Sequence, residues 1–479
     1  MTPTESAVLG TVLARHAEAL AAATSAPAAE APGRRPVHVV YGGAHLFTHD
    51  VAARLGQRAL QALEAWAPDF VTLARALRMP GAERLPVVPA ERQRLAARLA
   101  ADPAQVRRAE PQAYLAWAIH ERTRARLERE PVDDYRADFE DGFGVRPDAE
   151  EDDAADTVGR ELARGLVAGT LPAACGIRIK PLTPAWAERA ARTLERCLAA
   201  LAAGAPGRVP EGFVVTLPKV THAAQVTALA DACDALEARF GLPAGAIGIE
   251  LMIETPESVL APDGRVPLRV FVAAARGRCR GAHFGAYDYT AACGVVAAHQ
   301  SLAHPACVLA RQLMLAALAG TGVRLADGAV TRLPVAPHRP AEGAALLPAQ
   351  VDANRAAVHE GWRLHHDEVR RALREGFDLG WDLHPAQLVS RHAAVIGHYL
   401  EARDEAAARL EAFVAQAARA ARCGRDMDDA ATGRGLLQFF ARGLACGALT
   451  AAEAEVAGLA PEHLAPGGLE KWVAARVAR

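Results

Sequence analysis

Lysine is scarce in this chain of 479 residues. Only three of the 54 basic side chains are lysine, namely Lys180, Lys219 and Lys471. Arginine fills every other basic position, so a retained lysine marks a place where a compact ammonium group is not replaceable by a planar guanidinium. Lys180 and Lys219 each lie at the end of a predicted strand, and this position makes both of them informative.

Several other features are absent. No run of 18 apolar residues occurs, and the start of the chain lacks the basic and apolar stretches of a secretory signal. The eight cysteines form no CxxC pair, which argues against a structural zinc or a thioredoxin-like site. The formal net charge of -2 lacks the basic surplus of a nucleic-acid-binding domain. We therefore expect a cytoplasmic protein with reduced thiols and no membrane or nucleic-acid partner.

Short apolar runs are the main feature that is present. Eight of them alternate with longer segments of helical period, which predicts parallel strands buried on both faces. Eight such units predict an α/β fold, a closed (β/α)8 TIM barrel. No GxGxxG follows the first run and no P-loop occurs, which weakens the nucleotide-binding alternatives. The runs end near residues 43, 141, 181, 219, 254, 288, 328 and 385.

The spacing of the runs divides the chain into three parts. Residues 1–35 read as an N-terminal helix and lead-in, and residues 36–395 as the barrel. The barrel carries two insertions, an Arg-rich helical one at about 48–130 and a Pro/Ala-rich irregular one at about 333–355. Residues 396–479 form a helical C-terminal segment, expected to act as a lid or an oligomer contact.

Polar residues stand at the ends of the predicted strands, where a barrel of this kind places its chemistry. Glu254 is less suited to be a helix cap than the other carboxylates, because Thr255 and Pro256 already supply a cap and a first-turn proline. Asp288 ends the following strand. Two hard oxygen ligands, with water completing the coordination, suit Mg²⁺, and we interpret Glu254 and Asp288 as its ligands.

Charged residues on neighbouring strands complete this candidate site. Glu140 and Asp141 can reach the same ion, while Arg178 and Lys219 are cations that suit an anionic substrate. In this interpretation the substrate chelates the metal and Arg178 stabilises a developing enolate. The alternative is a ring of salt bridges that only stabilises the barrel. His384 is open to two interpretations, a structural hydrogen-bonding residue or a proton donor.

Six motifs, in the same order, resemble those of the HpcH/HpaI aldolase and citrate lyase β-subunit-like superfamily, which includes malyl-CoA lyases and is related to malate synthases. ADFEDGFG resembles its DLEDAV run, GIRIKP its arginine strand and VTLPKV its PKV strand. MIETPESV resembles the IETxxG metal strand, GAHFGAYDYTAACG the FGxxDxxxxxG strand, and GWDLHPAQL the IHPxQ strand. The resemblance covers residues 36–395 and extends into the C-terminal segment to 450. Within the superfamily the chain is similar to a long, less studied aldolase-like branch.

The resemblance implies roles for individual residues. Glu254 and Asp288 match the family's metal ligands, and Arg178 matches its substrate-binding arginine. Many members carry a further catalytic Asp four residues after a Gly on a C-terminal segment that reaches a neighbouring subunit. Gly424 and Asp428 fit that spacing, with Asp429 as the alternative, and a homo-oligomer is implied. Glu140 and Asp141 match the family's acidic pair near the metal.

The leading hypothesis is therefore a Mg²⁺-dependent carbon–carbon lyase, with Mn²⁺ as an alternative ion, that acts next to a 2-oxo or 2-hydroxy acid through a metal-stabilised enolate. Arg178 and Asp428 are the predicted catalytic residues, and Arg178, Lys219, Glu140 and Asp141 the predicted substrate-binding residues. The alternatives are a malate-synthase-like condensation of an acyl-CoA with a 2-oxo acid, phosphoryl chemistry on an enolpyruvate-type substrate, and a non-catalytic metal-binding or assembly protein. A CoA thioester substrate fits the resemblance, but no motif of the chain demands it.

Overall fold

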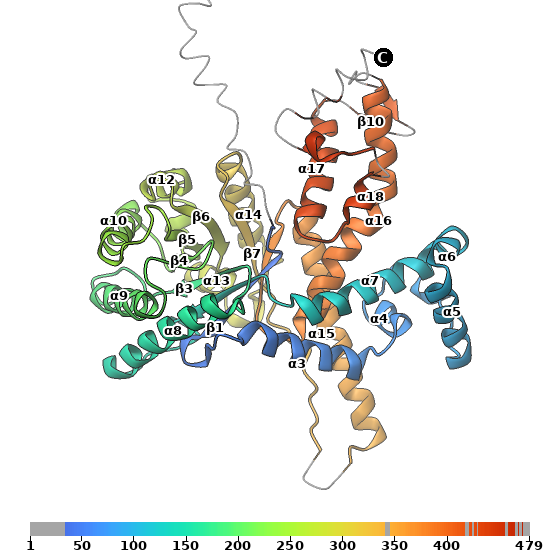
Figure 1. The fold of residues 1–479 in the computed structure, drawn as a ribbon, viewed down its shortest axis with the longest axis horizontal. Helices are drawn as coiled ribbons and strands as arrows, with labels where there is room; N and C mark the ends of the chain where they lie inside the picture. Colours follow the sequence, from blue (N-terminus) through green and yellow to red (C-terminus); the bar gives the residue numbers. More distant parts are fainter. Residues whose placement is uncertain are drawn as a thin grey trace, which may run out of the picture.

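Eight parallel strands close into a barrel in chain order, β1 to β8, in the computed structural model (Figure 1). The structure describes residues 34–340, 345–416, 421–423, 426–428, 430–455, 458–464, 468 and 472. All eight expected strands are present, which confirms the predicted fold class. Their bounds are β1 His38–Gly43, β2 Asp134–Asp138, β3 Ala174–Arg178, β4 Val214–Leu217, β5 Gly248–Ile253, β6 Cys279–Phe284, β7 Arg324–Ala329 and β8 Leu379–Asp382.

The strands are buried on both faces, as their continuous apolar sequences require. Every residue of β2, β3, β4 and β5 is buried. The register places Asp138, the last residue of β2, opposite Arg178, the last residue of β3. This pairing brings two charged side chains together at the C-terminal end of the barrel.

The long insertion between β1 and β2 is helical, as expected. Its helices are α3 Val51–Trp66, α4 Phe70–Ala76, α5 Pro89–Ala101, α6 Pro103–Ala109 and α7 Pro111–Arg129, with a 3-10 turn, η2, at Ala82–Arg84. Proline at the first position of α5, α6 and α7 divides the Arg-rich stretch into separate helices, because proline begins a helix far better than it continues one. Figure 1 shows α5 and α6 projecting to the side, away from the barrel.

The helices that follow β2 to β6 cover the outside of the barrel. Gly159 of α8 lies so close to α9 that an added Cβ would meet the carbonyl oxygen of Cys197 at 2.2 Å, so these two helices pack tightly. The bounds are α8 Asp148–Ala168, α9 Ala187–Gly204, α10 Ala223–Phe240, α11 Pro256–Val259, α12 Leu268–Ala274, α13 Ala286–Ala292 and α14 Pro305–Leu318. Short 3-10 turns occur at η1 Ala44–Leu46 and η3 Ala297–His299.

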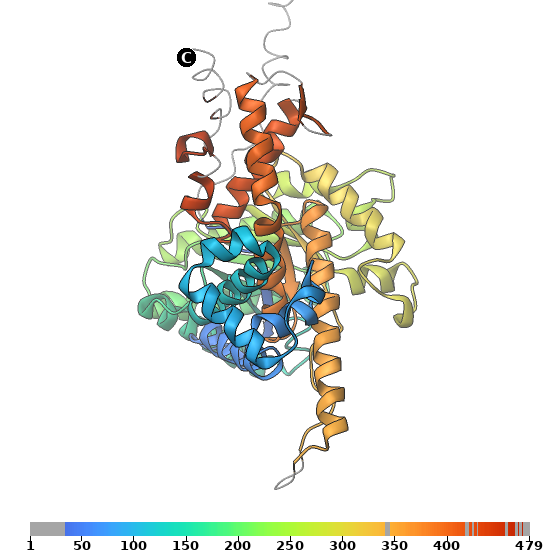
Figure 2. The ribbon, with the colours of Figure 1, turned by 90° about the vertical axis from the view of Figure 1, so that its right-hand side faces the viewer.

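The insertion after β7 is irregular only in its first part. Helix α15, Pro348–Arg374, begins inside the stretch that was expected to be a loop. Pro348 is at the first turn, and the backbone N–H of Leu347 donates to the side chain of Gln350 at 2.9 Å, so the helix start is capped. Figure 2 shows the first half of α15 and the chain before it projecting from the body of the protein.

The C-terminal part is built on one long helix. Helix α16, Gln387–Ala415, starts directly after β8, and its 29 residues rise about 43 Å. The strand pair β9 Ala421–Cys423 and β10 Asp426–Asp428 follows its far end, at the top of Figure 1. Helix α17, Ala430–Ala445, returns along α16, with Gly433 against Phe413 and Gly443 against Tyr399. Helix α18, Ala451–Glu455, and the turn η4, Pro461–Leu464, follow.

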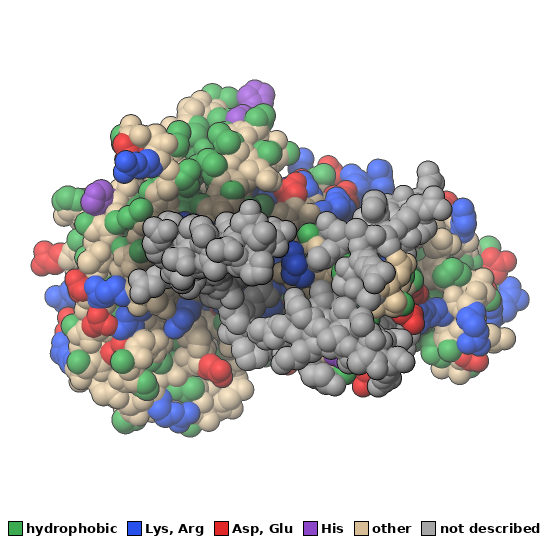
Figure 3. All heavy atoms as spheres, turned by 90° about the horizontal axis from the view of Figure 1, so that it is seen from above, with side chains coloured by type: hydrophobic (Ala, Val, Ile, Leu, Met, Phe, Trp, Pro, Cys, Tyr) green, Lys and Arg blue, Asp and Glu red, His purple; other side chains and the backbone are tan. Residues whose placement is uncertain are grey.

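The charge on one face of the surface and the apolarity of the helices are two further features of the described part of the chain. In Figure 3, which looks onto the face of the C-terminal helices, basic and acidic side chains of the described residues are interspersed. No helix in the described part of the chain combines the length and the apolarity needed to cross a membrane.

Candidate active site at the barrel mouth

Arg178 is fixed in place at the C-terminal end of β3. The side chain is 1% exposed, and its Nε and Nη2 donate to the two carboxylate oxygens of Asp138 at 2.7 and 2.5 Å. Burial disfavours the charged form, but the hydrogen bonds to Asp138 outweigh it and raise the pKa of Arg178. The third nitrogen, Nη1, lies 3.1 Å from Glu140 and 3.4 Å from Asp141 but has no well-aligned hydrogen-bond partner. It is therefore the nitrogen available to a ligand.

Asp138 also shapes the loop after β2. It accepts the backbone N–H of Glu140 at 2.9 Å and that of Gly142 at 2.8 Å. One buried carboxylate thus holds both the arginine and the loop that carries the acidic pair. Asp138 was not among the site residues predicted from the sequence. The alternation of the ADFED run was the available signal, because it puts residues 138 and 140 on the same side of an extended chain.

Three carboxylates surround the ammonium group of Lys219. Its Nζ lies 2.8 Å from Glu140, 3.2 Å from Asp288 and 3.9 Å from Glu254. Lys219 follows β4, Glu254 follows β5, and Asp288 lies in the first turn of α13 rather than at the end of β6, since that strand stops at Phe284. The structure therefore gathers four of the predicted site residues around one point.

Glu254 is held from several sides. It is 1% exposed, and the backbone N–H of Lys219 donates to its Oε1 at 2.7 Å. Thr255 caps α11 and Pro256 begins it, so Glu254 is not needed as a cap, as expected. Gly285 packs against the carboxylate, and an added Cβ there would meet Glu254 Oε2 at 2.6 Å.

Burial also changes the proton affinity of these acids. Burial first, and then the nearby Asp288 charge, raise the pKa of Glu254 to about 8 against the opposing effect of Lys219. Burial likewise raises the pKa of Glu140. For Lys219, burial lowers the pKa, but Glu254 and Glu140 outweigh it and the net shift is upward. The acids and the lysine are thus strongly dependent on one another's charge.

The donor set fits a hard divalent cation. Among the described residues no group of three His, Cys, Asp or Glu side chains is arranged as a ready metal cluster. Three carboxylates nevertheless lie within 4 Å of one cationic nitrogen. Oxygen ligands of this kind, supplemented by water, are what Mg²⁺ prefers. Glu140, Glu254 and Asp288 therefore supply the ligand type that such an ion takes. They lie 2.8 to 3.9 Å from the Lys219 nitrogen, so they would have to move inward to reach the roughly 2.1 Å of a Mg²⁺–oxygen bond at that position.

A buried polar network lies inside the barrel beside Arg178. The Tyr41 hydroxyl donates to Glu250 at 2.8 Å and lies 2.9 Å from His283 Nδ1. Arg136 and Thr216 also bond to Glu250, at 2.7 Å each. The Tyr41 ring lies 5.0 Å from the guanidinium carbon of Arg178, within cation–π range. Sequence reasoning missed this network, whose members lie far apart in the chain.

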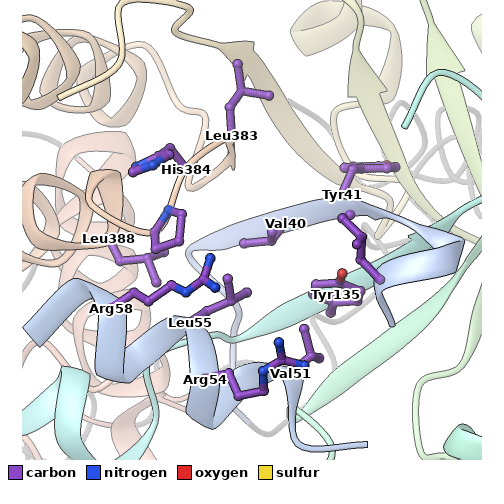
Figure 4. Close-up of a pocket in the computed structure, with 13 residues that line it drawn as sticks. Val40, Tyr41, Val51, Arg54, Leu55, Arg58, Tyr135, Leu383, His384 and Leu388 are labelled. Carbon is purple, nitrogen blue, oxygen red and sulfur yellow. The ribbon is translucent and has the colours of Figure 1, made fainter. Parts of the chain in front are cut away.

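A cavity of about 230 Å³ lies next to the mouth, between β1, α3 and the start of α16 (Figure 4). Its walls are mainly aliphatic, and Arg54 and Arg58 of α3 line it together with His384. None of the lining residues is an acid. His384 Nδ1 accepts the backbone N–H of Ala386 at 3.2 Å, which matches the structural interpretation of this histidine.

Other polar strand-end residues serve the framework. Asp382 binds Arg391 and His365, and Asp327 binds Arg311 and Arg371. The Lys180 ammonium bonds to Glu151 of α8 and to a backbone carbonyl group, so it lies apart from the carboxylates around Lys219.

The predicted C-terminal acid is not brought to the mouth of its own barrel. Asp428 ends β10, which follows the far end of α16, and its side chain lies outside the described residues. Gly424 and Asp429 also lie outside them. The catalytic role of Asp428 stays a prediction.

Comparison with solved structures identifies the class of fold. A citrate lyase from Burkholderia xenovorans matches with a TM-score of 0.50 and 20% identity, over 70% of this chain and 91% of that chain. Two further matches have a TM-score of 0.40. They are the protein CitE of Mycobacterium tuberculosis in complex with magnesium, acetoacetate and coenzyme A (20% identity, 69% and 95% covered) and a Haloferax volcanii malate synthase magnesium/glyoxylate complex (14% identity, 71% and 88% covered).

The match to the citrate lyase shows that the chain shares its fold, as the resemblance implied. A model of the family described as "Domain of unknown function (DUF6986)" matches residues 16–468, and the chain belongs to this family. The search of curated proteins gave no match.

Proposed function

We propose that this protein is a Mg²⁺-dependent carbon–carbon lyase that cleaves or forms a bond next to a 2-oxo or 2-hydroxy acid. The observation that carries the proposal is the grouping of Glu140, Glu254 and Asp288 around one cation position beside a fixed, charged Arg178. The citrate lyase-like fold supports it. Mn²⁺ is the alternative ion.

Each part of the site has a chemical role in this proposal. Glu254 and Asp288 would hold the ion, and Glu140 would be a third carboxylate beside it. The bound ion would polarise the oxygen of the substrate acid. Arg178 would donate from Nη1 to the oxygen that gains charge in the enolate, while Asp138 keeps the guanidinium from turning. One positioned donor of this kind contributes roughly 3 kcal/mol to stabilising a transition state.

Proton transfer needs a further group. Asp428 of a neighbouring subunit would be this group. Within one chain Asp428 is too remote, because the β9–β10 pair follows the far end of the long helix α16. A homo-oligomer therefore belongs to the proposal.

The cavity beside the mouth favours a second candidate, an acyl-CoA condensation with a 2-oxo acid. Its aliphatic walls suit the apolar part of a thioester arm, and Arg54 and Arg58 offer positive charge without a competing acid in the lining. Loss of thioester absorbance in the presence of glyoxylate is the measurement that favours this reaction over the lyase.

The direct test compares two carboxylate variants. We expect Glu254→Gln to abolish Mg²⁺-dependent release of a 2-oxo acid from candidate 2-hydroxy acids while the circular dichroism spectrum is unchanged. Glu257→Gln is the matched control, because Glu257 is exposed and lies three residues further along the same segment. Turnover that survives in Glu254→Gln would contradict the proposal.

A further inference from the structure

Lys219 has an unusual position for a lysine. Its side chain is 32% exposed, yet the ammonium nitrogen itself is buried among the carboxylates of Glu140, Glu254 and Asp288. The stem of the side chain therefore reaches the open mouth, while the charged end points inward. A lysine ordinarily does the opposite and keeps its charged end in water.

The backbone at Lys219 is also unusual. Its φ is +50°, in the left-handed region that side chains other than glycine rarely adopt, and only Arg78 and Arg276 share this feature among the described residues. Its backbone N–H donates to Glu254 at 2.7 Å while its Nζ lies 3.9 Å from the same carboxylate. One residue thus contacts Glu254 through both its main chain and its side chain.

Within the part of the chain that the structure describes, Lys219 is the cation whose ion pairs reach all three acids. Arg178 reaches only Glu140 of the three, at 3.1 Å through Nη1, and Asp138 binds its other two nitrogens. The ammonium of Lys219 is consequently the group that reduces the mutual repulsion of Glu140, Glu254 and Asp288. A divalent ion bound by the same three carboxylates would compete with it for the same space.

We infer that Lys219 is the resident counter-ion of the carboxylate site: its ammonium group keeps Glu140, Glu254 and Asp288 together in the metal-free protein and moves out to the mouth when Mg²⁺ binds. This inference rests on the proposed function, because it requires that the three acids bind the ion. It makes Lys219 a positioning residue that acts by exchange with the metal.

The first experiment is a calorimetric titration of metal-stripped protein with Mg²⁺. Lys219→Met removes the charge and keeps an unbranched side chain, so the backbone strain stays the same. We expect this variant to bind Mg²⁺ at least tenfold more tightly than the wild type and to have a lower Tm that Mg²⁺ restores. Lys219→Arg keeps a cation and is expected to bind as weakly as the wild type.

Lys180→Met is the matched control for loss of a lysine charge near the mouth. Its ammonium pairs with Glu151 at 2.7 Å, so its removal leaves the three carboxylates with their cation. We expect unchanged Mg²⁺ affinity. Equal or weaker Mg²⁺ binding by Lys219→Met would overturn the inference, whereas absence of Mg²⁺ binding in every protein, the wild type included, would overturn the proposed function itself.

The second experiment needs no variant and applies even if Lys219→Met does not fold. The chain has only three lysines, so acetic anhydride labelling followed by peptide mass spectrometry resolves each of them. We expect the labelling rate of Lys219 to rise several-fold in saturating Mg²⁺, while Lys180, the internal reference, keeps its rate. A labelling rate of Lys219 that is unchanged or lower in Mg²⁺ would contradict the exchange.

Discussion

The role of Asp138 yields a quantitative prediction. Asp138→Asn removes the charge that faces Arg178 but nearly preserves the size of the side chain. The two side chains are 2% and 1% exposed, so solvent screens their pairing little. Asn offers one acceptor oxygen, and in either orientation its NH₂ group would face two donors. These are Arg178 Nη2 with the backbone N–H of Gly142, or Arg178 Nε with the backbone N–H of Glu140.

The size of the effect follows from this geometry. Removing one partner of a buried ion pair costs about 3–5 kcal/mol of stability, because the other charge stays buried without compensation. Turnover should fall further than stability explains. An arginine that no longer points at the substrate loses the benefit of one fixed donor, roughly 100-fold to 1,000-fold in rate.

Asp133→Asn is the matched control. Asp133 is also buried, and it accepts from Arg34 at 2.8 Å and from the backbone N–H of Val37 at 3.0 Å. It precedes β2, at the end of the barrel opposite the mouth. We expect urea denaturation to show a similar loss for both variants, with turnover lost only in Asp138→Asn. Wild-type turnover in folded Asp138→Asn would refute the assigned role of Asp138.

Two further predictions concern packing and pH. Gly285→Ala would push its Cβ against Glu254 and should weaken Mg²⁺ binding about tenfold by calorimetry. Gly435→Ala is the control, because there is open space around Gly435. Equal Mg²⁺ affinities of the two variants would contradict the packing argument. Burial, followed by the charges of His38 and Arg126, lowers the pKa of His392 to about 3. The unfolded state then binds more protons below pH 6.5, so stability should fall by about 2 kcal/mol between pH 7 and pH 5. In His392→Gln, the urea midpoint should fall less between pH 7 and pH 5 than in the wild type, because this histidine no longer contributes. The same pH dependence in both proteins would contradict the role of His392.

The barrel was predictable because parallel strands buried on both faces leave continuous apolar runs. Glu254 was predictable as well, since Thr255 and Pro256 already fulfil the local needs of the next helix. The residue types around the mouth therefore followed from the chain order of the strands alone.

The contacts within the site were not predictable in the same way. Asp138 acquires its role from the β2–β3 register, which pairs it with Arg178 across 40 residues of sequence. The Tyr41–Glu250 bond joins residues 209 positions apart. Lys180 and Lys219 look alike as strand-end lysines, and only the packing of α8 shows that Lys180 turns to Glu151. These assignments depend on side-chain direction, which the sequence pattern does not carry.

In the proposed function, the carboxylates at the mouth bind a divalent ion together with a 2-oxo acid. Calorimetric titration of metal-stripped wild-type protein with Mg²⁺, alone and then with pyruvate, oxalate or glyoxylate, measures both binding events. We expect Mg²⁺ to bind and the acid to bind much more tightly in its presence. If neither Mg²⁺ nor the acids bind, the charged residues at the mouth are a structural ring of ion pairs, and the protein is not a lyase of this kind.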